Sequence, residues 1–371
     1  MRGPLSPEAA LGGHEFRGFF RRFQRLPLHL CHGPFSLAQA RQRSPKGLYL
    51  DTETTGLAGG AGTYAFLIGL AYFEQDELVV EQLFMRSHQE EKAMLGYLLE
   101  RVEMAEQLIT FNGRTFDVPL LQTRLIMNRL RFDLEECLHV DLLPACRRLW
   151  SLALDSCRLE HLESEILGLP RQGDIPGWMV PQIFFRFLHT GDARGLAAVA
   201  EHNRRDLLAM VGLMAGLDGY FERPTDWSAR FRAHPPLLHL EDLALAQQLY
   251  RQRRFEPVGE LLERVWAYFH PLGPSPPLRL AGGLWARWLR RHGLVEPARR
   301  IWMELADCFP QDAYLLEQAA KVQEHALRNW AGALDCVERA LGLDSLARGR
   351  RRSLLHRQQR LLRLAGGQVL G

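Results

Sequence analysis

The order of apolar runs between residues 47 and 145 constrains the fold of this chain more than any other feature. GLYLDTE is a short apolar run ending in polar residues, and two β-rich runs, TYAFLIGLAYF and ELVVEQLFM, follow it around the turn Glu74-Gln75-Asp76. Two such runs around a short polar turn predict a hairpin. EEKAMLGYLLERVEM and VPLLQTRLIMN have helical periodicity, and QLITF and LHVDLL are strand candidates. With helices dominating 142–221, this order predicts an α/β domain with a mixed sheet.

Composition divides the 371 residues further. We expect a basic N-terminal extension (1–46), the α/β domain (47–221), a linker rich in proline and polar residues (222–240), a helical region (241–346) and a basic C-terminal tail (347–371). The extension interleaves phenylalanines and arginines between Phe16 and Arg25. This pattern favours a short amphipathic helix docked on the main domain over a free arm that binds nucleic acid.

The helical region has an approximate internal repeat. Ala298 and Ala333 occupy equivalent places 35 residues apart, each followed four positions later by a larger residue, Trp302 and Val337. A period of about 34 residues, with small residues where helices cross, resembles tetratricopeptide repeats. Generic helical hairpins are the alternative, and the tryptophans of this region fit a core better than base-stacking platforms.

The formal charge of +3 is unevenly placed. Residues 1–46 carry +6 and residues 347–371 carry +7, so the remaining chain carries −10, and nearly all the basic charge is arginine. Guanidinium groups match phosphate geometry, so basic ends around an acidic middle suit a nucleic-acid partner. Arginine-rich, merely solvated ends are the alternative.

Other classes of protein are excluded by composition. Hydrophobic residues make up 47% and charged residues 24% of the chain, unlike a disordered protein. No run approaches the ~18 uncharged apolar residues of a membrane span, and the N-terminus lacks a secretory layout. Six scattered cysteines without a CxxC pair predict reduced thiols in a cytoplasmic protein.

The residues that suggest chemistry are acidic and far apart in sequence. Asp51 and Glu53 end the first strand two positions apart, so both side chains project from the same face. Asp117 follows the strand QLITF and opens a helix. Asp206 lies on a helix four positions after His202, a spacing that places the imidazole and the carboxylate on one helical face.

Four carboxylates gathered together would repel one another unless cations lay among them. Their hard oxygen atoms suit Mg²⁺ or Mn²⁺. Two such ions, ~4 Å apart, activate a water molecule and stabilise the leaving oxygen of a phosphodiester. A nearby imidazole is suited to accepting the proton of that water. Taken singly, each acid is weak evidence for this chemistry.

Together, three motifs resemble the DEDD superfamily of 3′–5′ exonucleases, which have the ribonuclease-H-like fold. They are LDTETTGL, FNGRTFDVPLL and HNRRD, in the expected order. Within the superfamily the chain is most similar to the YprB-type ribonuclease-H-like group. Further support comes from GGAGTYAFLIGLAYF, HVDLL and RQGDIPGWMVPQIFFRFLHTGDARGLAAVAEHNRRDLLAM. The likeness covers about residues 47–217.

The resemblance implies roles for individual residues. Asp51, Glu53 and Asp206 would hold two ions, with Asp51 bridging them, and Asp117 would act on the second ion directly or through water. The segment that follows the first acidic pair would lie against the terminal nucleotide, namely Thr54, Thr55 and Gly56.

The sequence departs from the pattern at His202. Exonucleases with a histidine base usually carry it five positions before the last aspartate, whereas His202 is four positions before Asp206. Asn112 stands five positions before Asp117, as in the proofreading domains of some polymerases. Despite this departure, His202 is expected as the general base, with a structural or substrate-positioning role as the alternative.

Three other features are set aside from the catalytic set. Asp141 in LHVDLL fits a helix cap better than a metal ligand. Asp174 in GDIPGW is marked by the resemblance without a role. GLAGGAGT lacks the ending of a phosphate-binding loop and fits a flexible loop beside the first strand.

The sequence thus predicts a metal-dependent nuclease, a 3′–5′ exonuclease acting on single-stranded ends. The helical region would dock a protein partner or guide the substrate. A nuclease-like binding scaffold with little turnover, and a structure-selective endonuclease on the same fold, are the alternatives.

Overall fold

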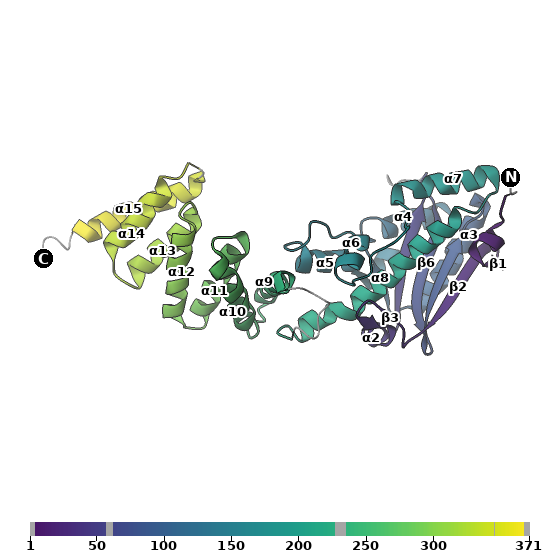
Figure 1. Cartoon of the computed structure of the whole chain (residues 1–371). Helices are drawn as coiled ribbons and strands as arrows, with labels where there is room; N and C mark the ends of the chain where they lie inside the picture. The colour runs from purple at the N-terminus through teal and green to yellow at the C-terminus, as the bar shows by residue number, and fades with distance from the viewer. Residues whose placement is uncertain (1–3, 57–61, 227–234, 345, 367–371) are drawn as a thin grey trace. The chain divides into compact units, whose positions relative to one another are not determined.

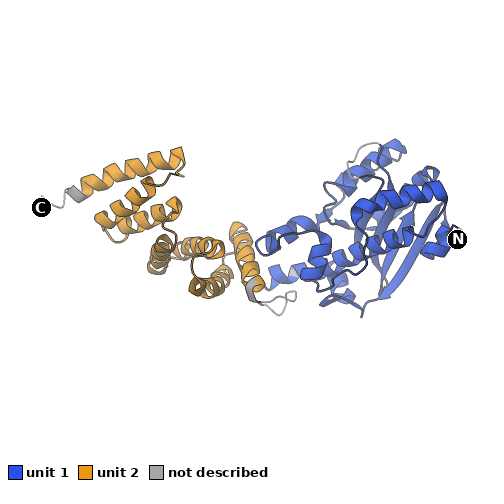
Figure 2. Cartoon of the chain, turned by 45° about the horizontal axis from the view of Figure 1, so that its top comes forward, with its two compact units in different colours: residues 1–233 blue, residues 234–371 orange. Residues whose placement is uncertain are grey.

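A seven-stranded mixed sheet organises the first half of the chain. The structure, a computed structural model, describes residues 4–56, 62–226, 235–344 and 346–366. Contacts divide the chain into two compact units, residues 1–233 and 234–371, coloured separately in Figure 2.

The central strands form in the order expected from the sequence. β5 (Gly47–Thr54) pairs antiparallel with β6 (Ala65–Glu74), which pairs antiparallel with β7 (Glu77–Phe84), so the predicted hairpin is confirmed. β8 (Gln107–Thr110) and β9 (His139–Asp141) extend the sheet on the other side of β5 as parallel strands. The order across the sheet is β1-β2-β7-β6-β5-β8-β9, which places β5 between an antiparallel and a parallel neighbour.

The N-terminal segment belongs to this sheet. β1 (His14–Phe16) and β2 (Phe19–Pro27) form a hairpin, and β2 pairs with β7 from Phe20 to Pro27. The prediction of an amphipathic helix between Phe16 and Arg25 is therefore wrong. The remainder of the segment forms short elements, α1 (Pro7–Leu11), β3 (Cys31–His32), β4 (Phe35–Ser36) and α2 (Leu37–Arg43).

Two long helices cover opposite faces of the sheet. Gln82 of β7 donates a hydrogen bond to Asn203 of α8 (Leu196–Glu222), whereas Glu81 accepts one from Tyr97 of α3 (Glu91–Met104). Neighbouring strand residues point to opposite faces, so α3 and α8 enclose the sheet between them. Figure 1 shows α8 running along one face. Four further helices complete the unit, α4 (Asp117–Met127), α5 (Leu142–Trp150), α6 (Leu159–Glu165) and α7 (Val180–Thr190).

The second unit is helical, and each helix contacts the next along the chain. Its members are α9 (Pro235–Arg251), α10 (Val258–Phe269), α11 (Pro276–Arg291), α12 (Val295–Cys308), α13 (Ala313–His325), α14 (Trp330–Leu341) and α15 (Arg348–Gly366). α9 begins inside the range predicted as a linker. Ala298 and Ala333 are both buried, and the resemblance to tetratricopeptide repeats stays a prediction. The basic tail forms α15, which buries Leu354 and Leu361.

None of the helices in the described part of the chain is long and apolar enough to cross a membrane. All six cysteines are free thiols.

Candidate active site

The first two carboxylates lie at the end of the central strand β5. Asp51 pairs across the sheet with Gly69 of β6, and its Oδ2 accepts a hydrogen bond of 2.8 Å from Asn203 of α8. Glu53, two residues on, is buried, and its Oε1 atom has no hydrogen-bond partner among the described residues. A buried carboxylate oxygen without a donor is costly unless a cation or another donor reaches it.

Asp117 enters the site from the start of α4. It is buried, and its Oδ1 accepts a hydrogen bond of 2.5 Å from the hydroxyl of Thr52 on β5. The preceding loop is held by Asp141, whose carboxylate accepts the backbone N–H groups of Asn112 at 2.8 Å and Arg114 at 3.2 Å. Asp141 also accepts the N–H of Leu143 as the cap of α5. The interpretation of Asp141 as a helix cap is confirmed.

Asp206 and His202 reach the site from α8. His202 Nε2 lies 3.6 Å from Asp206 Oδ2, the proximity that their spacing of four residues predicts. The helix comes close to the sheet at Gly69, where a Cβ atom would lie 2.2 Å from Asn203 Oδ1. A glycine at this position therefore permits the docking of α8 that brings its side chains to β5.

The four carboxylates lie close enough to repel one another, and this repulsion acts on their pKa values. Burial, followed by repulsion from Asp206 and Asp117, raises the pKa of both Asp51 and Glu53 well above the ordinary value. Burial raises the pKa of Asp117 to about 6, against the hydrogen bond from Thr52. Burial also raises the pKa of Asp206, although attraction to Arg171 and His202 opposes it. The structure thus brings together all four acids, which the sequence separates by up to 155 positions.

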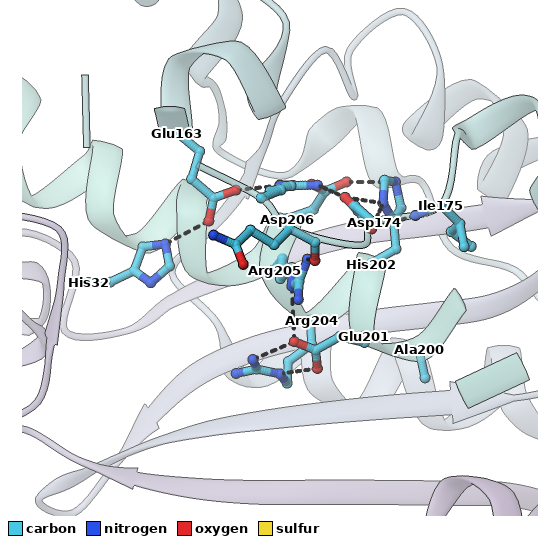
Figure 3. A network of polar contacts seen from close by, with 12 residues as sticks. His32, Glu163, Asp174, Ile175, Ala200, Glu201, His202, Arg204, Arg205 and Asp206 are labelled. Atoms are coloured by element: carbon cyan, nitrogen blue, oxygen red, sulfur yellow. Dashed lines mark hydrogen bonds and ion pairs between the residues drawn. The ribbon is translucent and has the colours of Figure 1, made fainter. Parts of the chain in front are cut away.

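A second network of charges adjoins these acids (Figure 3). The buried guanidinium of Arg171 forms ion pairs with Glu163 of α6, with Asp206, and with Asp174 at 2.9 Å. Glu163 in turn lies 3.1 Å from His32 Nε2. Arg171 is therefore a cation built into the acidic site.

Asp174 completes the surroundings of His202. Its Oδ2 lies 2.9 Å from His202 Nδ1, and both side chains are only 14% exposed. Although burial acts to raise it, the pKa of Asp174 is lowered by hydrogen bonds from His202 and Arg171. When His202 Nδ1 donates to this carboxylate, Nε2 faces Asp206. His202 thus lies between two carboxylates, with Nδ1 next to Asp174 and Nε2 next to Asp206.

Sequence reasoning missed part of this network. Arg171 and Glu163 carry no periodic signal, and nothing in the sequence marks Asn203 beside His202. The family resemblance marks Asp174 but gives it no role. The charged residues Arg171 and Asp174 in RQGDIPGW were the available signal, because this stretch lies within the family resemblance but had no assigned chemistry.

Whether the four acids suit a metal ion depends on the groups around them. Within the described ranges, no group of three His, Cys, Asp or Glu side chains is arranged so that it could hold an ion. The donor set nevertheless fits Mg²⁺ or Mn²⁺, because it supplies only hard carboxylate oxygens. Glu53 Oε1 has no hydrogen-bond partner among the described residues, and the pKa values of Asp51 and Glu53 are raised, so Arg171 does not offset all of the carboxylate charge.

The segment predicted to contact the terminal nucleotide, Thr54 to Gly56, is held by hydrogen bonds within itself and to Tyr64. Thr54 donates its hydroxyl proton to the carbonyl of Gly56 at 2.8 Å, and the hydroxyl of Thr55 accepts the N–H of Tyr64 at 2.9 Å. These bonds fix the exit of β5 beside the acids. The glycine-rich loop predicted to be flexible falls largely on 57–61, outside the described residues.

Two comparisons place the chain among known proteins. Residues 48–217 match the family model described as the RNase_H superfamily. Over 298 residues, covering 79% of this chain and 68% of the relative, the chain is 31% identical to the uncharacterized protein YprB of Bacillus subtilis (strain 168). The likeness to the YprB-type group and the ribonuclease-H-like fold expected from the motifs are confirmed.

Proposed function

We propose, from the premise that this chain belongs to the ribonuclease H superfamily, that it hydrolyses nucleic acid in a divalent-metal-dependent reaction. Membership supports a nuclease-type activity in general. The finer proposal is a DEDD-type 3′–5′ exonuclease acting on single-stranded ends. The observation that carries it is the group of four buried or half-buried carboxylates around β5, in which Glu53 Oε1 has no donor among the described residues.

Asp51, Glu53, Asp117 and Asp206 would hold two Mg²⁺ or Mn²⁺ ions. When bound, such ions supply an activated water and stabilise the leaving oxygen of the phosphodiester. Asn203 orients Asp51 through its amide, and Thr52 orients Asp117 through its hydroxyl. These two contacts hold one oxygen of Asp51 and one of Asp117 in place.

His202 would accept the proton of the attacking water at Nε2. Asp174 supports this role because it engages Nδ1 and leaves the other nitrogen directed at Asp206. Arg171 forms ion pairs with both Asp174 and Asp206, so it fixes the distance between the two carboxylates on either side of His202. Thr54, Thr55 and Gly56 would lie against the terminal nucleotide, with the Thr54 hydroxyl donating to Gly56 and the Thr55 hydroxyl accepting from Tyr64.

The proposal is tested with end-labelled single-stranded DNA and RNA, incubated with the full chain in Mn²⁺ or in EDTA. We expect a metal-dependent ladder that shortens from the 3′ end and is abolished in Asp51→Asn. The matched control is Asp155→Asn, because Asp155 is a loop residue outside the acidic cluster. Internal cuts would favour the endonuclease alternative.

The ion pair between Arg171 and Asp206 favours one second candidate. A cation already seated among the acids is compatible with a nuclease-like scaffold that binds nucleic acid with little turnover. Binding without cleavage, unchanged in Asp51→Asn and Asp206→Asn, would support that candidate. The helical unit as a partner-docking module and a cytoplasmic location, consistent with six free thiols, complete the proposal.

A further inference from the structure

The helical unit contains a cavity of about 400 Å³ whose charged lining is basic. We call it the basic groove and define it by the cations that line it, Arg290, Arg299, Lys321, His325 and Arg357. Apolar side chains between these cations include Ala298, Trp302 and Val322. No Asp or Glu is among the described residues that line it.

The carboxylates behind the groove do not balance its cations. Lys321 and Arg350 share Glu317, at 2.8 and 3.6 Å. Arg357 and Arg360 share Glu324, which is only 3% exposed. Arg299 pairs with Glu296. Three carboxylates are thus shared among six permanent cations, namely Arg290, Arg299, Lys321, Arg350, Arg357 and Arg360, and Arg290 forms no ion pair with a described residue. The groove therefore keeps an excess of positive charge.

The same charge continues along α15, which supplies Arg357 to the groove. The helix has no acidic residue. Arg348, Arg352 and Arg363 are exposed on it and form no ion pair with any other residue that the structure describes. Because its charged side chains are all basic, α15 extends the positive surface beyond the cavity.

We propose that the basic groove and α15 bind single-stranded nucleic acid, with their basic side chains on the phosphates. A row of arginines suits a polymer with evenly repeated phosphates, because each guanidinium donates two parallel hydrogen bonds to one phosphate. Binding through phosphate contacts is sequence-tolerant and salt-sensitive. This site lies entirely within the second unit and requires no hydrolysis, so it goes beyond the proposed nuclease.

The test measures the anisotropy of a fluorescent single-stranded oligonucleotide titrated with the full chain in EDTA, over a series of salt concentrations. The variant combines Arg290→Ala with Lys321→Ala. The control combines Arg251→Ala with Arg339→Ala, which removes the same charge from exposed positions of the helical unit outside the groove. Thermal melts verify that both variants fold as the wild type does.

We expect the groove variant to bind roughly tenfold more weakly than the control, because it loses two phosphate contacts. Its slope of log K against log salt should be shallower by about 1.4, or ~0.7 for each lost contact to a single strand. Equal binding by the two variants would overturn the proposal. So would displacement of the oligonucleotide by lower concentrations of poly-glutamate than of unlabelled oligonucleotide, since the groove would then prefer acidic peptides. If the wild type does not hydrolyse the oligonucleotide but the groove variant still binds it more weakly than the control, the proposed binding site is supported and the proposed nuclease activity is refuted.

Discussion

At the scale of single residues, the contact between the Asp174 carboxylate and His202 Nδ1 favours a proton on Nδ1. An amide in place of this carboxylate can donate to Nδ1 instead and reverse the arrangement. We expect Asp174→Asn to lower kcat roughly 10- to 100-fold, the usual effect of losing such a supporting contact, with little change in KM. Steady-state hydrolysis of a single-stranded oligonucleotide in Mn²⁺ measures both constants.

A spectroscopic measurement distinguishes a changed proton position on the His202 ring from a general loss of structure. The ¹⁵N shifts of the His202 ring should report a proton on Nδ1 in the wild type and its loss in Asp174→Asn. Asp155→Asn is the control for charge removal. A rise in KM alone, with unchanged ring shifts, would assign Asp174 to substrate binding.

Asp117 makes the stability of the metal-free protein depend on pH. Its folded pKa of about 6 exceeds the ordinary 3.8, so the folded chain keeps a proton that the unfolded chain has released. Stability is therefore lost as the pH rises through this interval. We expect Asp117→Asn to stabilise the metal-free protein at pH 8 by about 1–3 kcal/mol, from ~1.4 kcal/mol per pKa unit, and to have little effect at pH 4. Thermal melts in EDTA measure the difference.

Added Mn²⁺ provides the complementary observation. It should raise the melting temperature of the wild type at pH 8 and raise that of Asp117→Asn less. A variant that is less stable than the wild type at both pH values would show that the Asp117 charge is already compensated in the metal-free chain.

At the scale of elements, the site depends on how closely α8 approaches β6. Gly69→Ala places a methyl group within 2.2 Å of the Asn203 amide, and the amide contacts Asp51. We expect the variant to lose about 1–3 kcal/mol of folding stability through overpacking, and to bind Mn²⁺ more weakly because α8 carries Asp206 away from Asp51. Denaturant unfolding and Mn²⁺ titration calorimetry measure the two effects.

Gly96→Ala is the matched control. Nothing lies within 4 Å of a Cβ at this position of α3, so the change should stabilise the helix by up to ~1 kcal/mol and leave Mn²⁺ affinity unchanged. Equal behaviour of the two variants would show that the approach at Gly69 does not control the site.

At the scale of the whole molecule, the N-terminal segment is part of the sheet and cannot be removed as an appendage. Phe19 and Phe20 of β2 are buried, and Arg21 forms an ion pair with the fully buried Glu81 of β7. We expect a chain shortened to residues 47–371 to lose the cooperative unfolding of its first unit, because β7 becomes an uncovered edge and Glu81 loses a cation. Differential scanning calorimetry of both chains checks this. An unchanged first transition would mean that residues 1–46 are dispensable.

The sequence by itself determined the features set by local spacing. Alternation along β5 places Asp51 and Glu53 on one face, a spacing of four on α8 places His202 beside Asp206, and the run 64–84 forms the expected hairpin. These relations follow from the strand period of two and the helix period of 3.6, so they need no knowledge of distant residues.

Only the tertiary structure decided which distant groups meet. The phenylalanines of the N-terminal segment recur at a spacing that also suits a helix, but pairing with β7 makes them a strand. Arg171, Asp174 and Asn203 gain their roles from partners that lie 28 to 152 positions away. Ion pairs and strand pairing depend on distance in space, and no local period encodes that distance.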